Sequence, residues 1–424
     1  MFTTLKNAWS IPELRKKLLF TLLILMLYRV GNVIPVPYID VGTLAAYFES
    51  TLSTTILGLY DAMSGSAFSQ ATVFALGIQP YINASIIIQL LTIAIPALER
   101  MAKEEGEEGK KKIGRITRYT TVGLGLLLGF AYYTMLNNYA SQGLPIITEE
   151  GFLPAVVIIL AFAAGSAVVM WLGEQITEYG IGNGISMILF ANIISAIPHG
   201  ISSLIAMGWW QAILVVIAII ALVVFIVFIN DAERRIPIQY AKRVVGRKIY
   251  GGQSTNLPIK VSMSGVMPVI FASSICSIPA TICTLGGWTD TKVYEILFAN
   301  TSWVYVIVYG LMIFFFSWFY STIQYDPVEI ANNLKKNGGF IPGFRPGKPT
   351  ADFIKRVINK IVIFGAVYLA IVALLPLVAG NLVADLQNLA IGGTSVIIVV
   401  GVALETVKAL EAQMLMRHYK GFLD

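Results

Sequence analysis

The amino-acid sequence predicts an all-α polytopic membrane protein with ten transmembrane helices arranged in two related halves. Of its 424 residues, 56% are hydrophobic and only 13% are charged, and the mean hydropathy is +0.74. A soluble protein of this length cannot bury so much apolar surface. Ten apolar runs are long enough to cross a bilayer, and two marked helix starts of the first half recur in the second.

The apolar runs give the helices in chain order. Runs of about 17–25 apolar residues mark bilayer-spanning helices. Here they lie near 18–34, 73–96, 119–137, 153–172, 185–204, 213–229, 263–285, 302–323, 357–378 and 386–404. The first run lacks a small-residue cleavage site and leads into the segment 31–37, so we interpret it as a retained helix and not as a signal peptide.

Two short segments recur in the same order and predict the division into halves. Gly77–Ile87 returns as Gly265–Ile275, with Gly, Pro, Ile, Ala, Ser and a final Ile in register, and Gly184–Leu189 returns as Gly393–Ile398. Aligned backbone breakers make a chance match less plausible. Related halves in membrane proteins usually enclose a path between them. We therefore expect an amino-terminal half over 1–204 and a carboxyl-terminal half over 205–424.

The positive charges predict the orientation in the membrane. If the amino terminus is cytoplasmic, every Lys and Arg except Arg29 and Lys292 falls in a cytoplasmic segment, so both termini are expected inside. Two of these segments, about 230–262 and 324–356, are long and basic. Such loops can act simply as anchors to anionic lipid. Their Pro, Gly, Tyr and Phe residues instead favour fixed shapes that meet a partner.

Residues 38–72 allow two interpretations. They are mildly apolar but rich in small polar residues. A short helix that re-enters the membrane and packs inside a protein cavity explains both properties, because irregular backbone at membrane depth must be covered by protein or water. An ordinary surface loop with one amphipathic turn explains them equally well.

The sequence shows no pattern typical of an enzyme, a metal site or a cofactor site. Ionisable residues, which mark ion or proton pathways in membranes, are almost missing from the helix centres. Cys276 and Cys283 share a helix face but match no metal or redox motif, so we interpret them as packing thiols. There is no phosphate loop, zinc-protease motif or nucleophile elbow.

Several motifs together resemble one known family. They are Tyr28–Gly31 with Ile34–Pro37, Phe74–Ser85, Trp171–Glu178 with Gly180–Gly184, Arg235–Pro237 with Tyr240–Arg243, Phe344–Gly347 and Gly392–Ser395. Over nearly its whole length the chain resembles the SecY family of protein-translocation channels. The resemblance implies two inverted five-helix halves around a central hourglass pore with a short plug helix. It implies a channel that moves unfolded polypeptides across the bacterial plasma membrane and releases transmembrane segments sideways into lipid.

The resemblance also implies roles for individual residues. The pore ring carries over onto Ile78, Ile82, Leu189, Ile193, Ile270 and Ile398, and the internal repeat independently couples Ile82 with Ile270 and Leu189 with Ile398. The plug carries over onto Leu57, Gly58, Leu59, Tyr60, Asp61, Ala62, Met63, Ser64, Gly65, Ser66, Ala67, Phe68 and Ser69. The lateral gate carries over onto Asn83 and Ile278.

Partners are implied by the same resemblance. They are the small membrane subunits SecE and SecG, the SecA ATPase, the ribosome, polypeptides that bear a signal sequence, and the lipid bilayer. Candidate docking residues are Arg243, Arg247 and Arg345. One departure concerns Asn192, which stands where the family more often has a small apolar residue; helical spacing puts it about 100° from the ring residue Ile193.

One alternative class stays open, a secondary transporter of a small solute, because such proteins also use inverted repeats and broken helices. A midplane site of charges or unwound carbonyls would favour the transporter. An apolar waist without central charges favours the channel.

Overall fold

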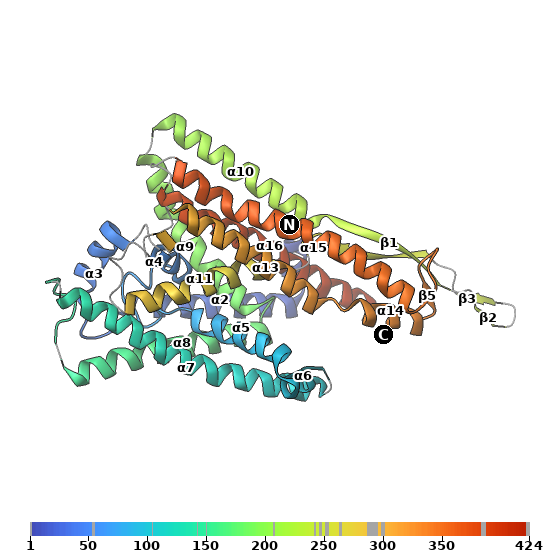
Figure 1. Ribbon diagram of the computed structural model, residues 1–424, viewed down its shortest axis with the longest axis horizontal. Coiled ribbons are helices and arrows are strands. Elements are labelled where there is room, and N and C mark those ends of the chain that lie inside the picture. The colour runs from blue at the N-terminus through green and yellow to red at the C-terminus, as the bar shows by residue number, and fades with distance from the viewer. Residues whose placement is uncertain are drawn as a thin grey trace.

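The structure is a computed structural model. It describes residues 2–420 except 53–55, 104, 142, 150, 207, 241–242, 246–247, 251–253, 263–264, 286–295, 298–301 and 383–386. An elongated body of helices carries a few short strands that project from one end (Figure 1). The membrane part is therefore all-helical, as the sequence predicts.

Each of the ten predicted runs contains a helix. These are α2 (Pro12–Gly31), α5 (Gln79–Ala94), α7 (Gly106–Ser141), α8 (Phe152–Tyr179), α9 (Gly184–Ala206), α10 (Trp209–Asp231), α11 (Met267–Leu285), α13 (Trp303–Gln324), α15 (Lys348–Leu382) and α16 (Gln387–Lys420). By length and composition alone, 5 helices in the described part of the chain qualify as spans, or up to 6 if α5 and the segment after it, bent by 106°, form one. The α9 and α11 helices contribute shorter apolar segments that end at Pro198 and Pro279.

Two of these helices begin later than the apolar runs suggest, and they begin in the same way. Gly77 and Gly265 both have the left-handed backbone that glycine adopts readily, with φ of +52° and +58°. The α5 and α11 helices each start two residues later, with Pro80 and Pro268 in the first turn, a favoured place for proline. The repeated segments thus have equivalent backbones.

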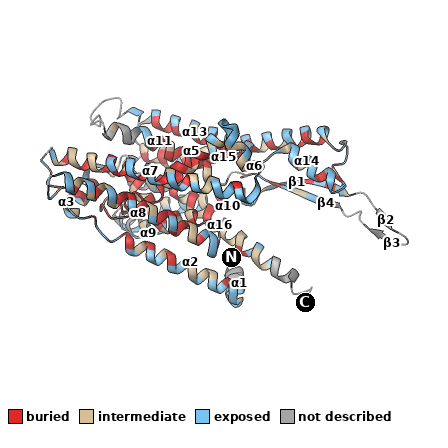
Figure 2. Cartoon of the chain, turned by 90° about the horizontal axis from the view of Figure 1, so that it is seen from below, coloured by how far each residue is buried: buried red, intermediate tan, exposed pale blue. Residues whose placement is uncertain are grey.

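The helices with repeated starts meet between the halves. The α5 helix packs against α11, and α9 packs against α16. A large buried hydrophobic cluster includes residues of all four helices. Buried residues accordingly gather in the middle of the helical body (Figure 2).

Six short helical segments also belong to the described part of the chain. They are α1 (Phe2–Ser10), α3 (Val41–Tyr47), the π-helix η1 (Phe48–Leu52), α4 (Ile56–Ser64), α6 (Pro96–Lys103) and α14 (Pro327–Lys336). The α4 helix packs against α9 and α16 and buries Leu57, Tyr60 and Met63. Of the two interpretations of residues 38–72, the structure therefore has the buried helix and not the surface loop.

The long basic loops form a small antiparallel sheet that the sequence did not predict. Its strands are β1 (Glu233–Tyr240), β4 (Ser254–Lys260) and β5 (Gly339–Phe340) in the order β4-β1-β5, and β2 (Arg243–Val245) pairs separately with β3 (Lys248–Tyr250). Gln239 pairs with Phe340, so the sheet joins the first loop to the second. The alternating side chains Ile236 and Ile238 are buried in one cluster with Ile354 of α15. This packing fixes the sheet on the helical body.

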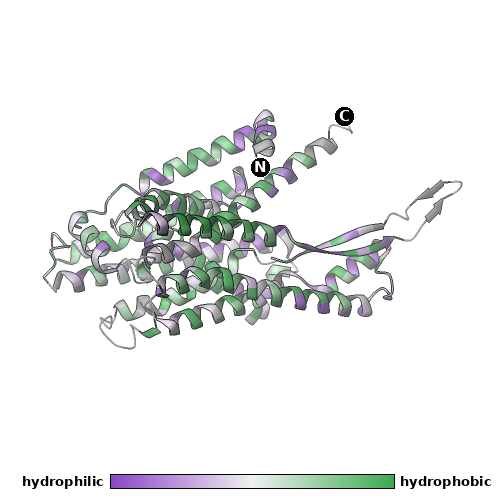
Figure 3. Cartoon of the chain, turned by 90° about the horizontal axis from the view of Figure 1, so that it is seen from above, coloured by the Kyte–Doolittle hydropathy of each residue, from purple (hydrophilic) through white to green (hydrophobic). Residues whose placement is uncertain are grey.

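Hydrophobic residues occur throughout the body of helices (Figure 3), and many large ones are exposed at its surface. The α10 helix is the strongest case, since Ile217, Ile220 and Phe228 are all more than half exposed. Apolar faces of this extent do not occur on soluble monomers, and a bilayer covers them.

The two ends of the chain lie on one side of the body. Ala8 of α1 and Leu14 of α2 are buried in one small cluster with Leu410 of α16. Lys408, one half-turn away, pairs with Asp231 at the end of α10 at 2.7 Å, next to the start of the β-sheet. The start of the chain and the carboxyl part of α16 therefore share the end that carries the basic loops.

Candidate functional site

The six residues predicted for the pore ring all lie in one large buried hydrophobic cluster, which also includes residues of α10, α13 and α15. The six come from the start of α5, from α9, from α11 and from α16. Their exposed fractions are 2% for Ile78, 5% for Ile82, 1% for Leu189, 8% for Ile193, 3% for Ile270 and 4% for Ile398. The predicted ring residues thus come from four helices, and all six are buried in the apolar interior.

Branched aliphatic side chains give this centre a simple chemistry. They offer no hydrogen bonds, so water gains nothing there and an ion would lose its hydration shell. The buried polar residues in the described part of the chain are Ser, Thr, Asn and Gln, with no Asp, Glu, Lys or Arg among them. No group of three or more His, Cys, Asp or Glu residues that could hold a metal ion occurs there either.

The residues predicted for the plug form a helix and a turn. The helix α4 ends at Ser64, and Gly65 and Ser66 follow with φ of +70° and +64°. Met63 belongs to the same hydrophobic cluster as the ring, so the carboxyl end of α4 lies against the apolar centre. Leu57, Tyr60 and Phe68 lie in the neighbouring cluster.

The turn after α4 is fixed to α7. The Tyr132 hydroxyl donates to the Phe68 carbonyl at 2.6 Å, and the two rings pack edge to face with centroids 4.5 Å apart. Farther on, the Val73 amide donates to the Ile34 carbonyl at 2.9 Å. The chain therefore leaves α4 through a short left-handed turn and is held beyond it by these bonds.

Amide side chains bind the last carbonyls of α4. Asn192 is fully buried, and its Nδ2 donates to the Met63 carbonyl at 2.8 Å and to the Tyr28 hydroxyl at 2.9 Å. Asn32 Nδ2 donates to the Ser64 carbonyl at 3.2 Å. The last carbonyls of a helix have no partner within it, so side-chain donors are suited to this end. The Asn192 amide thus binds the end of α4 and Tyr28 of α2.

Space at the end of α4 is closed to side chains. A Cβ atom on Gly65 would lie 3.0 Å from Asn192 Oδ1 and 3.1 Å from an Arg29 guanidinium nitrogen. Sequence reasoning missed the contacts of Tyr28, Asn32 and Asn192 with α4. These contacts could have been suspected from the polar side chains of the three residues within otherwise apolar segments, because a buried amide requires a hydrogen-bond partner.

The two residues predicted for the lateral gate lie on helices that pack together, α5 and α11. Asn83 is 5% exposed and lies in the interior, whereas Ile278 is 36% exposed and lies nearer the outer surface. A hydrogen bond joins the same helices near the ring: Ser274 Oγ donates to Gln79 Oε1 at 3.2 Å. Sequence reasoning did not select Gln79 or Ser274.

Of the three docking residues, Arg345 is the one whose side chain the structure describes. Arg247 lies outside the described residues, and for Arg243 only the backbone, at the start of β2, is described. Arg345 is exposed in a fixed turn. Phe344 stacks on Phe353 with ring centroids 4.3 Å apart, and Thr350 Oγ1 donates to the Arg345 carbonyl at 2.7 Å.

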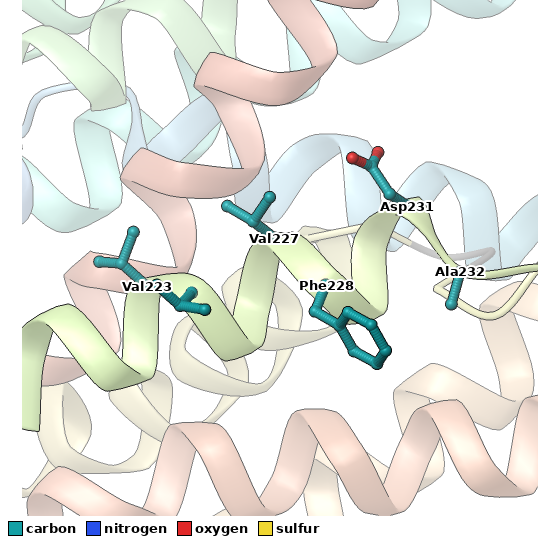
Figure 4. Close-up of a pocket in the computed structure, with 6 residues that line it drawn as sticks. Val223, Val227, Phe228, Asp231 and Ala232 are labelled. Atoms are coloured by element: carbon teal, nitrogen blue, oxygen red, sulfur yellow. The ribbon is translucent and has the colours of Figure 1, made fainter.

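A pocket of about 560 Å³ borders the end of α10, and none of the six predicted ring residues is among the residues that line it (Figure 4). Val223, Val227 and Phe228 line it together with Asp231 and Ala232. Its wall comes from one helix whose Phe228 is 71% exposed, so the pocket faces outward. A solute site between two halves would instead draw residues from both.

Comparisons with known proteins agree with this geometry. The SecY family model matches residues 72–407. The chain is 43% identical to protein translocase subunit SecY of Streptomyces scabiei, over 100% of both chains. It is 42% identical to protein translocase subunit SecY of Thermotoga maritima, over 100% of this chain and 98% of that protein.

Solved structures share the fold. A protein-conducting channel superposes with a TM-score of 0.67 at 20% identity, covering 94% of this chain and 92% of that one. Sec61 in the canine ribosome–channel complex gives a TM-score of 0.64 at 19% identity with the same coverage. Together with the identity of the curated relatives over their full length, these findings show that the chain belongs to the SecY family of protein translocase subunits.

Proposed function

We propose that this chain is a protein-conducting channel that moves unfolded polypeptides across the bacterial plasma membrane and releases transmembrane segments sideways into lipid. One observation carries the proposal: six aliphatic residues from four helices all belong to a single buried hydrophobic cluster, and a short helix, α4, packs against two of these helices. A dry waist of this kind blocks ions, and pliant side chains can close around a moving chain of varied sequence.

In the proposed resting state, the ring and α4 seal the path together. The ring residues Ile78, Ile82, Leu189, Ile193, Ile270 and Ile398 exclude water, and residues 57–69 fill the space beside them. Weak hydrogen bonds and side-chain packing hold α4, so an incoming polypeptide can displace it without breaking a covalent bond. The channel itself catalyses no reaction in this scheme.

The lateral exit is proposed to lie between α5 and α11, near Asn83 and Ile278. A segment in the path can then sample lipid through the parted helices. Each Leu or Ile favours the bilayer centre by about 0.3–0.6 kcal/mol, and each Lys or Asp opposes it by about 2.5–3.5 kcal/mol. Partition alone thus sorts membrane helices from secreted segments.

The driving force is proposed to come from partners that bind the projecting loops. Two structural neighbours were solved together with a ribosome: Sec61 in the canine ribosome–channel complex and the idle yeast Ssh1 complex bound to the 80S ribosome. We propose the ribosome and the SecA ATPase as partners of Arg243, Arg247 and Arg345, and SecE and SecG as further membrane subunits. The basic loops and both chain ends would face the cytoplasm, in keeping with the charge distribution.

Reconstitution tests the proposal. Vesicles that contain the purified channel complex are expected to import a polypeptide with a signal sequence when a motor and ATP are present. A polypeptide trapped in the channel should change ion conductance, and deletion of residues 57–69 should raise the resting ion leak or relax signal-sequence selectivity. Uptake of a small solute without any polypeptide transport would overturn the proposal in favour of a transporter.

A further inference from the structure

Gln79 uses both ends of its side-chain amide to join different parts of the structure. Its Nε2 donates to the Met63 sulfur of α4 at 3.4 Å, and its Oε1 accepts from Ser274 Oγ of α11 at 3.2 Å. Gln79 is 4% exposed, Met63 is 4% exposed and Ser274 is 0% exposed. One buried amide thus contacts the plug helix on one side and a gate helix on the other.

The serines of α11 show that the contact to Gln79 is selective. Ser273 Oγ donates to the Ile270 carbonyl at 2.8 Å, and Ser277 Oγ donates to the Ser274 carbonyl at 2.6 Å. Both bonds stay within α11, as is usual for helical serine. The Ser274 hydroxyl instead leaves its helix and donates to Gln79. Ser273 therefore provides a matched control, since it neighbours Ser274 and is also buried.

Gln79 lies at the start of α5, so its contacts depend on how α5 and α11 are placed relative to each other. It is the first residue of α5, directly after the left-handed turn at Gly77. A buried amide that loses a partner is left unsatisfied, which is costlier than losing the same bond at a surface. When α11 moves away from α5, Gln79 Oε1 loses its donor, the Ser274 hydroxyl. The side-chain conformation in which Nε2 donates to the Met63 sulfur is then no longer the favoured one.

We propose that Gln79 is a positioning residue that couples separation of the gate helices α5 and α11 to release of the plug helix α4. The coupling rests on the proposed function, because it requires α4 to be displaced in the open channel. Gln79 favours the closed arrangement of both elements at once. A signal sequence that parts α5 from α11 therefore also weakens the hold on Met63, before any polypeptide touches the plug.

A thiol placed on the plug tests the coupling. In the full channel complex in vesicles, Cys276 and Cys283 are replaced by Ala, and Ala62→Cys on α4 is labelled with a maleimide. The labelling rate is measured without and with a synthetic signal peptide. In the otherwise unaltered chain we expect the peptide to speed labelling, which gives a reference ratio of the two rates.

The variants Gln79→Met, Ser274→Ala and Ser273→Ala are then compared with this reference. Gln79→Met keeps the length of the side chain but removes both hydrogen bonds. We expect Gln79→Met to raise the labelling rate without peptide by about 2- to 10-fold, which corresponds to the free energy of the one bond to Met63 that holds α4. The labelling rate with peptide should not change. Ser274→Ala should also raise the rate without peptide and so lower the ratio of the two rates, whereas Ser273→Ala should leave this ratio unchanged. The double variant of Gln79→Met and Ser274→Ala should have the same ratio as Gln79→Met alone.

Two results would overturn the coupling. One is a Ser274→Ala ratio equal to that of Ser273→Ala. The other is a double variant whose effect is the product of the single effects, which is expected of two independent packing defects. If the signal peptide does not speed labelling even in the unaltered chain, the plug assignment itself fails and the coupling fails with it. That outcome is distinguishable, because it appears before any change at position 79.

Discussion

Replacing Asn192 by Ala should weaken the binding of α4, the proposed plug helix, by a predictable amount. The side chain donates to the Met63 carbonyl of α4 and to the Tyr28 hydroxyl of α2. The bond to Tyr28 exists whether or not α4 is in place, so it cancels between the closed and displaced states. Only the bond to Met63 distinguishes them. One net hydrogen bond contributes about 1 kcal/mol, which corresponds to about a fivefold change in the closed-to-displaced ratio.

The expected increase can be measured as ion conductance. Channel complexes in planar bilayers, without any polypeptide substrate, should show an open fraction about fivefold higher for Asn192→Ala than for the unaltered chain. Asn32→Ala should act in the same direction, because Asn32 donates to the neighbouring Ser64 carbonyl. Ser166→Ala is the control: Ser166 is equally buried but donates to Ala163 within α8. Equal conductance for Asn192→Ala and Ser166→Ala, at equal yield of complex, would refute the reasoning.

Three further predictions address the gate, the ring and the docking loop. With the native cysteines replaced, a disulfide between Asn83→Cys and Ile278→Cys should stop export until it is reduced, and unimpeded export of crosslinked protein would place the gate elsewhere. Ile270→Asn puts an amide into the apolar cluster, so we expect water to enter and resting conductance to rise; a dry, silent channel would contradict the assignment of the ring. Arg345→Glu reverses an exposed charge and should weaken motor-driven import while the complex still assembles; loss of assembly would make Arg345 a structural residue.

The positions of the helices followed from the sequence because the bilayer imposes a length on apolar runs. The repeat added more, since Gly77 and Gly265 carry the same backbone conformation in the structure. The exact starts of α5 and α11 lay beyond hydropathy, because the apolar runs continue through the turns that precede them. The position of a left-handed glycine, not the edge of a run, decides where each helix begins.

Other features depend on contacts between distant segments and were not predictable. The strand β1 pairs with β5 across a separation of about a hundred residues, and the pairing of Gln239 with Phe340 has no local signature. Asn192 posed a different problem. Helical spacing placed it away from the direction of Ile193, but only the folded chain shows that the Met63 carbonyl lies within 2.8 Å of its amide. Buried polar residues find their partners through tertiary structure, which periodicity does not reveal.

The combination of polar and apolar contacts around α4 suits the proposed plug, which has to be displaced and to rebind. Apolar contacts alone would seal well, but their loss on release scales with the area exposed. Hydrogen bonds from amide side chains to the last carbonyls of α4 fix its orientation. Water can replace these donors once α4 moves, so the net free energy lost on release stays small. The Phe68 carbonyl, by contrast, is held by Tyr132 beyond the turn at Gly65 and Ser66. We propose that α4 is released at the waist while Phe68, near the end of the predicted plug segment 57–69, stays bound to α7, and that this bond limits how far a displaced α4 can travel.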